Sequence, residues 1–164
     1  MVILGIDPGL ALMGYGVIDY TAGKYRVLTY GCISTAAHSP IPQRLRSIYT
    51  GMKQLIDIYQ PEDIAFEELF FAQNITTGIA VAQARGAALA AAAQYTENLY
   101  EYTPLQIKQA ITGYGRAEKQ QMQQMVKLLL HMDEIVKPDD AADALAAAIT
   151  HSNCLHAKEM YKIK

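Results

Sequence analysis

The sequence predicts an α/β fold in which three antiparallel strands come first and alternating strands and helices follow. Three β-rich runs, VILGID (2–7), GYGVIDY (14–20) and KYRVLTYGCI (24–33), are separated by short connections that contain glycine, as in an antiparallel meander. Beyond them, apolar runs alternate with helical patterns, which is typical of α/β proteins. The 164 residues, 51% of them hydrophobic, are ample for one packed core and few for two domains.

The clearest helical pattern lies between Pro40 and Pro61. Seven apolar side chains recur there at spacings of three and four, the stripe of an amphipathic helix: Leu45, Ile48, Tyr49, Met52, Leu55, Ile56 and Tyr59.

The second half of the chain continues the alternation. We expect a buried strand at 63–69, an Ala-rich helix from about 75 to 97, and a further strand in LYEYTP (99–104). Helices should follow over about 104–111, 118–131 and 140–151. No repeat, linker or low-complexity stretch interrupts this pattern, so we expect one domain spanning 1–164.

Charge is distributed unevenly along the chain. The net charge of −2 and the pI of about 6.1 exclude a global attraction to nucleic acid or to an anionic membrane. Residues 104–131 nevertheless hold four basic side chains against Glu118 alone, which leaves +3 there and −5 elsewhere: Lys108, Arg116, Lys119 and Lys127. This stretch is either a binding patch for nucleic acid or an ordinary solvated face.

Cysteine usage and hydropathy indicate a cytoplasmic protein without membrane association. Cys32 and Cys154 are too few and too far apart for a disulfide framework or a zinc cluster, so we expect reduced thiols. No signal-peptide pattern precedes the first strand, and the most apolar tract, 78–93, is interrupted by Gln83 and Arg85.

Two carboxylates occur where the apolar sequence predicts burial. Asp7 closes the strand VILGID, and Glu67 lies inside the run IAFEEL. A buried carboxylate costs free energy unless it is paired or ligated. Asp7, which precedes Pro8 and Gly9, could instead be a turn residue. Glu68 competes with Glu67 because neighbours on a strand face opposite ways, and alternation alone does not choose between them.

Two more acids stand at a predicted helix start, in KPDDAADALAAAIT. Asp140 and Asp143 are three residues apart and face the same way on a helix, whereas Asp139 points elsewhere. Pro138 and the acids mark the first turn, where the helix dipole favours ionised carboxylates, so we expect them to be charged at neutral pH. The alternative is a capping role for Asp140 and a surface position for Asp143.

If the first and fourth strands are neighbours, these four carboxylates converge on one site. Two like charges about 4 Å apart repel by roughly 4 kcal/mol at an effective dielectric constant of about 20, so the cluster requires a cation. Oxygen ligands suit Mg²⁺ or Mn²⁺, and no His or Cys spacing indicates zinc. Two such ions would activate a water and stabilise the leaving oxygen of a phosphodiester.

The motifs resemble, in order, those of the RuvC family of bacterial Holliday junction resolvases in the RNase H-like superfamily. The resemblance covers nearly the whole chain: GIDPGLALMGYGVID, RLRSIYTGMKQLI, AFEELFFAQN, QARGAALAAA, IKQAITGYGRAEKQQMQQMV and DDAADALAAAITH. It implies an RNase H-like fold, a mixed five-stranded sheet with three antiparallel strands and then parallel strands, flanked by helices. It also implies Asp7, Glu67, Asp140 and Asp143 as the catalytic, Mg²⁺-binding acids, with Glu67 chosen over Glu68.

The resemblance further implies how the protein meets DNA. It implies a homodimer that nicks two strands of like polarity in a four-way junction and works with the RuvA–RuvB branch-migration complex in recombination and repair. The aromatic residue that meets the crossover would be Phe70, with Phe71 as its neighbour, unless both belong to the core. Lys108 and Lys119 correspond to functional lysines of the family, and Arg116 could also meet phosphate.

Two other classes fit part of the sequence. IDPGLALMGYGVID alone also suits an actin-like ATP-binding protein or sugar kinase, but such proteins pair two domains and carry a second phosphate loop that is not found here. A non-catalytic junction-binding protein would be expected to lose at least one acid, whereas all four are present. The Ala-rich helix with Gln83, Arg85 and Gly86 suits either a dimer interface or packing on the sheet.

Overall fold

A computed structural model describes residues 1–69 and 75–164, with the side chains of 75–77 left out. Its strands are β1 (Val2–Asp7), β2 (Leu12–Thr21), β3 (Lys24–Ser34), β4 (Asp63–Glu67) and β5 (Leu99–Tyr102). Its helices are α1 (Ile41–Tyr59), α2 (Ile75–Ala93), α3 (Pro104–Thr112), α4 (Lys119–Leu129) and α5 (Asp139–Asn153), followed by the 3₁₀ segment η1 (Leu155–Tyr161).

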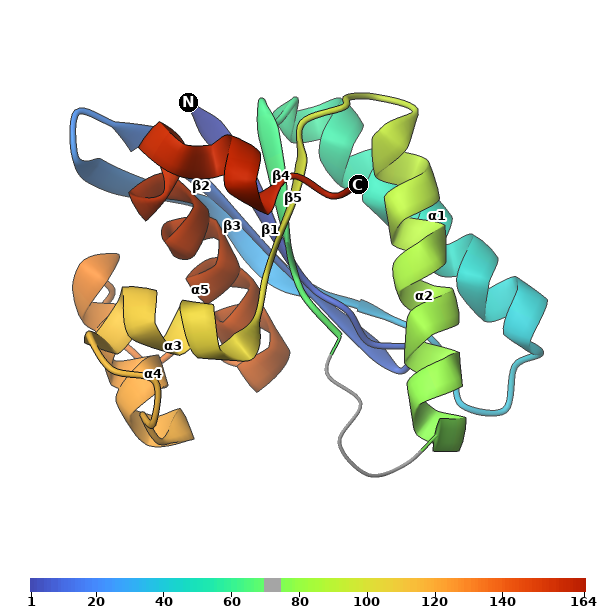
Figure 1. Cartoon of the computed structure of the whole chain (residues 1–164). Helices are drawn as coiled ribbons and strands as arrows, with labels where there is room; N and C mark the ends of the chain where they lie inside the picture. The colour runs from blue at the N-terminus through green and yellow to red at the C-terminus, as the bar shows by residue number, and fades with distance from the viewer. Residues whose placement is uncertain (70–74) are drawn as a thin grey trace.

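The strands form one mixed sheet in the order β3-β2-β1-β4-β5 (Figure 1). β1, β2 and β3 pair as an antiparallel meander, and β4 and β5 extend the sheet in parallel with β1. β1 and β4 are buried on both faces, which is why their sequences are continuous apolar runs and do not alternate. The predicted order of antiparallel and parallel strands is confirmed.

Helices cover both faces of the sheet. α1 and α2 lie on one face, whereas α3, α4 and α5 lie on the other (Figure 1). Two apolar clusters fill the space between these layers. One joins Leu4, Ile6 and Phe66 to α1 and α2, and the other joins Ile3 and Ala65 to α3, α4 and α5. The alternation along β1 and β4 therefore decides that Asp7 and Glu67 belong to the α5 side.

The backbone of the central helix α5 lies directly against glycines of the sheet. Its apolar face is mostly alanine, and β1 and β2 present glycines beneath it. A Cβ atom added at Gly5 would overlap the backbone of α5, and one added at Gly14 would overlap the Asp140 carbonyl. Small residues on both surfaces therefore bring the first turn of α5 down onto the end of β1.

The element boundaries differ from the sequence expectations in a few places. β4 ends at Glu67, α2 ends at Ala93 and α4 ends at Leu129, each earlier than expected. One face of α2 packs on the sheet through buried alanines, which was one of the two alternatives for this helix. Among the described residues, no helix combines the length and the apolar character that a membrane crossing requires.

Candidate active site

Two of the predicted acids end neighbouring parallel strands. Ile6 of β1 pairs with Phe66 of β4, so Asp7 and Glu67 follow side by side at the carboxyl edge of the sheet. Both side chains are half-buried, whereas Glu68 is exposed and donates its backbone N–H to the Tyr102 carbonyl at 2.9 Å. The structure therefore places Glu67, and not Glu68, beside Asp7.

The other two acids come from the first turns of α5. Asp140 and Asp143 are carried to this edge because α5 rests on the sheet at Gly14, the residue that pairs with Asp7 across β1 and β2. We call Asp7, Glu67, Asp140 and Asp143 the acid cluster. All four predicted acids are brought to one place, from three elements that are far apart in sequence.

The acid cluster opposes its own ionisation. Burial, and after it the charges of Glu67, Asp143 and Asp140, raise the pKa of Asp7 to about 8. Burial and the charge of Asp143 raise the pKa of Glu67 to about 7, and burial also raises the pKa of Asp143. At Asp143 burial therefore acts against the helix dipole, and the expectation that the first-turn acids of α5 are charged at neutral pH stays a prediction.

Two of the predicted lysines border the acid cluster. The lining of a cavity of about 300 Å³ includes Glu67 and Asp143 together with Lys108 of α3 and Lys119 of α4. Lys119 Nζ lies 3.8 Å from Asp143 Oδ2. Both ammonium groups lower the pKa of Glu67, in opposition to burial. The cavity therefore brings anionic and cationic groups together in one lining.

Asp139 takes a different position from the one expected. Because 139 and 143 are four residues apart on α5, they share a face, and Lys119 lies between them. Asp139 also accepts hydrogen bonds from Gln123 and Lys137, both at 2.8 Å. The side-chain bonds of Lys137 and Lys119 hold the pKa of Asp139 down at about 2. Sequence reasoning missed Gln123 and Lys137, although the i+4 spacing of 139 and 143 was a signal for the shared cation.

A second polar cluster, far from the acids, was also missed. His151 Nε2 lies 2.8 Å from Asp63 Oδ2, its Nδ1 lies 2.8 Å from the Tyr102 hydroxyl, and Lys158 Nζ of η1 lies 2.7 Å from Asp63. Asp63 and His151 are 1% and 0% exposed. Although burial opposes ionisation, the hydrogen bonds from His151 and Lys158 hold the pKa of Asp63 below its usual value. The sequence feature that could have indicated this cluster is Asp63, a carboxylate at the start of a buried strand.

This buried cluster fixes α5 against β4. From Asp63 to Glu67 the strand advances four residues, about 13 Å. From His151 back to Asp143 the helix advances eight residues, about 12 Å. The two distances match, so a contact between Asp63 and His151 at one end places Asp143 opposite Glu67 at the other.

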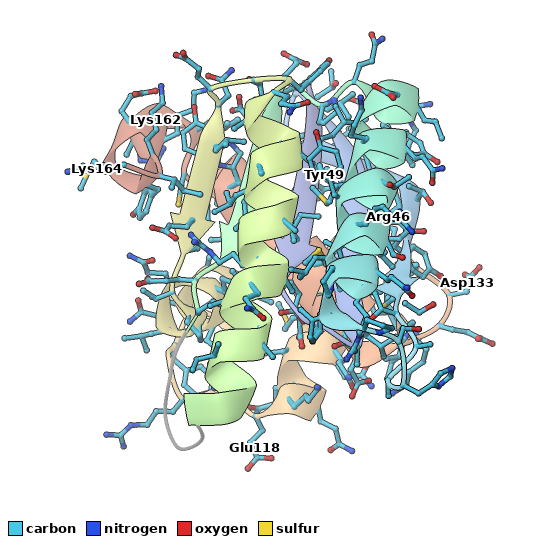
Figure 2. The ribbon with its side chains drawn as sticks, turned by 90° about the vertical axis from the view of Figure 1, so that its right-hand side faces the viewer. Arg46, Tyr49, Glu118, Asp133, Lys162 and Lys164 are labelled. Carbon is cyan, nitrogen blue, oxygen red and sulfur yellow. The ribbon has the colours of Figure 1, made fainter. Side chains whose placement is uncertain are left out.

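The remaining predicted residues lie outside this geometry. Arg116 is exposed in the connection between α3 and α4 and does not line the cavity. Phe70 and Phe71 lie outside the described residues. Figure 2 shows Glu118, which directly precedes α4, at the far end of the molecule from Lys162 of the C-terminal segment.

The donor chemistry of the acid cluster fits a hard divalent cation. All four side chains offer carboxylate oxygens, the ligands that Mg²⁺ and Mn²⁺ prefer. Burial, with the charges of the neighbouring acids, raises the pKa of Asp7, Glu67 and Asp143, and a cation bound among them would favour their ionised forms. Among the described residues, no three acidic, histidine or cysteine side chains are already drawn together to the spacing of a single bound ion.

A mixed five-stranded sheet with helices on both faces, and with carboxylates at the ends of two central parallel strands, has the architecture of an RNase H-like α/β protein. Comparison with known proteins gives the family. The family described as crossover junction endodeoxyribonuclease RuvC matches residues 3–151. The chain therefore belongs to the RuvC family of crossover junction endodeoxyribonucleases.

Relatives and solved structures agree over the whole length. The crossover junction endodeoxyribonuclease RuvC of Alkaliphilus metalliredigens is 52% identical over 164 residues, which are 100% of each chain. The structure of Thermus thermophilus RuvC is 35% identical with a TM-score of 0.87, and the match covers 95% of this chain and 96% of that one. T. thermophilus RuvC in complex with a Holliday junction substrate matches with the same TM-score at 32% identity and the same coverage. An actin-like kinase fragment is thereby excluded.

Proposed function

We propose that this chain is an endonuclease that resolves Holliday junctions and that its acid cluster performs the cleavage. Membership of the RuvC family supports the activity. The observation that carries the site is the convergence of four carboxylates from β1, β4 and α5, which raises the pKa of Asp7 to about 8. Such a concentration of buried negative charge is unfavourable unless a cation neutralises it. All four acids are present, which disfavours a non-catalytic junction-binding protein.

The cofactor belongs to the proposal. Family membership implies metal-dependent catalysis, and we infer Mg²⁺, with Mn²⁺ as a substitute and two ions per site, held by Asp7, Glu67, Asp140 and Asp143. When bound, the ions supply an activated water and stabilise the leaving oxygen of the phosphodiester. The half-buried carboxylates hold this charge at the sheet edge, and the glycine at position 14 keeps α5 close enough for Asp140 to take part.

The basic residues would position the DNA. Lys108 and Lys119 line the cavity beside Glu67 and Asp143, where their ammonium groups can neutralise a phosphate next to the reacting bond. Arg116 is exposed in the adjoining connection and would meet a phosphate outside the cavity. Phe70, directly beyond the described end of the β4 segment, is proposed to contact the bases at the crossover.

The four-way junction also suggests the assembly. T. thermophilus RuvC forms a complex with a Holliday junction substrate, and a two-fold symmetric junction suits a homodimer that nicks two strands of like polarity. We further propose that the 164 residues act as one nuclease domain, that the enzyme works with RuvA and RuvB, and that it acts in the cytoplasm, where chromosomal DNA lies. Ile79 of α2, which is 58% exposed, leaves a surface of this helix open to a second copy.

A single assay tests the proposal. The protein is incubated with end-labelled four-way DNA or with linear duplex of the same sequence, in Mg²⁺ or in EDTA. We expect paired nicks, symmetric about the junction centre, only with four-way DNA and Mg²⁺. Equal cutting of linear duplex would contradict selectivity for the junction, and cutting in EDTA would contradict the metal-dependent site.

A further inference from the structure

Asp139, the residue directly before Asp140, uses both of its carboxylate oxygens. Oδ1 accepts hydrogen bonds from Gln123 Nε2 and from Lys137 Nζ, each at 2.8 Å. Oδ2 forms an ion pair with Lys119 Nζ at 3.2 Å. Asp139 therefore has three partners although it is not a member of the acid cluster.

Two of these partners lie on one helix. Lys119 and Gln123 are four residues apart on α4 and therefore share a face of it. Gln123 is only 7% exposed, so this contact is well fixed, whereas the Lys119 side chain is 58% exposed. Asp139 thus attaches the first turn of α4 to the first turn of α5 and orients Lys119 relative to the acid cluster.

Lys119 forms ion pairs with two carboxylates. Its Nζ lies 3.2 Å from Asp139 Oδ2 and 3.8 Å from Asp143 Oδ2. An ammonium group paired with Asp143 competes with a divalent cation for the same oxygens. While Asp139 is present, Lys119 still has an anionic partner after Asp143 binds a divalent cation. Without Asp139, Asp143 is the one of those two carboxylates that remains to pair with Lys119.

We propose that Asp139 is a positioning residue: it holds Lys119 closer to itself than to Asp143 and so leaves Asp143 more available to the divalent cation. The inference rests on the proposed function, because it assumes that the acid cluster binds the ion. It differs from two simpler roles for Asp139. In one, the aspartate merely adds negative charge near the site. In the other, it only stabilises the start of α5 through the helix dipole.

A double-mutant cycle separates these roles by measuring Mn²⁺ binding to the whole protein by calorimetry at low ionic strength, without DNA. In the Lys119 background, Asp139→Asn should raise the Kd for Mn²⁺ about threefold to fivefold, the size expected for a partly exposed ion pair. In a Lys119→Met background, Asp139→Asn should raise the Kd by much less, because the competing ammonium group is gone and only the loss of one nearby negative charge remains. Thermal unfolding verifies that each variant is folded.

Two further variants sharpen the cycle. Glu134→Gln removes the same charge from an exposed position in the connection between α4 and α5 and should change the Kd by less than Asp139→Asn does. Gln123→Met removes a contact that orients Asp139 without changing any charge. It should raise the Kd in the Lys119 background alone, which neither simpler role predicts.

Two results would overturn the inference: an equal effect of Asp139→Asn in both backgrounds, or an effect no larger than that of Glu134→Gln. Failure of the proposed function would look different. If Asp7→Asn left Mn²⁺ binding unchanged, the acid cluster would not be the metal site and both claims would fall. If Asp7→Asn weakened binding but the cycle showed no coupling, the positioning role of Asp139 alone would fall.

Discussion

Asp7 and Glu67 retain protons at a pH where free carboxylic acids have lost them. Their pKa values, about 8 and about 7, lie above the ordinary values of 3.8 and 4.5 because of burial and the neighbouring acids. In the unfolded chain these groups ionise near pH 4, whereas in the folded protein they ionise several pH units higher. Their contribution to stability is therefore complete below about pH 4 and is lost as the pH rises through about 7 and 8.

The first prediction follows from this difference. In EDTA, the free energy of unfolding should fall as the pH rises from about 4 to about 8, and Asp7→Asn should reduce that fall because it removes the group with the largest shift. Urea unfolding at a series of pH values measures it. If the parent and Asp7→Asn curves were parallel over this range, Asp7 would not carry the raised pKa.

Gly14 gives a second test at the residue scale. A Cβ at this position would overlap the Asp140 carbonyl, so Gly14→Ala must displace the first turn of α5. We expect a loss of about 1 to 3 kcal/mol in stability and a large loss of cleavage by the protein that remains folded. Gly86→Ala is the control for stability, since its Cβ would meet nothing within 4 Å and alanine favours a helix interior by roughly 1 kcal/mol. A fully active Gly14→Ala protein would show that the close approach of α5 is unnecessary.

At the scale of elements, α5 and β4 meet at both ends: Asp63 contacts His151 at one end, and Glu67 lies opposite Asp143 at the other. Asp63→Asn leaves the buried His151 and the Lys158 ammonium without their carboxylate, and breaking such a pair should cost about 3 kcal/mol or more. Asp19→Asn breaks ion pairs at the surface and should cost less than about 1 kcal/mol. Urea unfolding compares the two variants.

The same variant tests the register between α5 and β4. Since the pKa of Asp63 is lowered in the folded protein, its contribution to stability is present at neutral pH and is lost as the pH falls through the acid range, so Asp63→Asn should be less sensitive to acid. Folded Asp63→Asn protein should also cut junctions more slowly, because Asp143 is no longer fixed opposite Glu67. Unchanged cleavage would limit the buried cluster to a role in stability.

The elements also show what the sequence can predict. The meander and α1 follow from local periodicity, since a strand of period two or a helix of period 3.6 needs no distant information. Asp7 and Glu67 were predicted because carboxylates in apolar runs conflict with burial, and Asp140 and Asp143 because a spacing of three at a helix start gives them a common face. Only the resemblance to the RuvC family chose Glu67 over Glu68. The contact between Asp63 and His151 spans 88 residues, and no local pattern indicates it. The position of Asp139 was missed because residues three and four apart on a helix both share a face. Asp143 therefore has Asp140 on one side and Asp139 on the other.

For the whole molecule, the distribution of charge predicts how DNA binding responds to salt. Lys119 lies beside the acid cluster, and each lost phosphate contact removes roughly one unit from the slope of log K against log salt. Lys119→Ala should therefore flatten the salt dependence of junction binding and slow cleavage. Lys24→Ala is the control, because β3 begins at the end of the sheet away from Asp7. An unchanged slope would make Lys119 an ordinary solvated residue.

The central claim is that cleavage depends on the negative charge of the acid cluster, which the fold holds at one edge of the sheet. Asp7→Asn tests it most directly, because asparagine keeps the size and the local hydrogen bonds of a turn residue while it removes the charge. The measurement is the rate of junction nicking in Mg²⁺ together with junction affinity in EDTA. We predict that the rate falls by several orders of magnitude, since the metal supplies much of the barrier lowering, while affinity in EDTA is equal or higher because repulsion is relieved. Nicking at close to the parent rate by Asp7→Asn would contradict the claim.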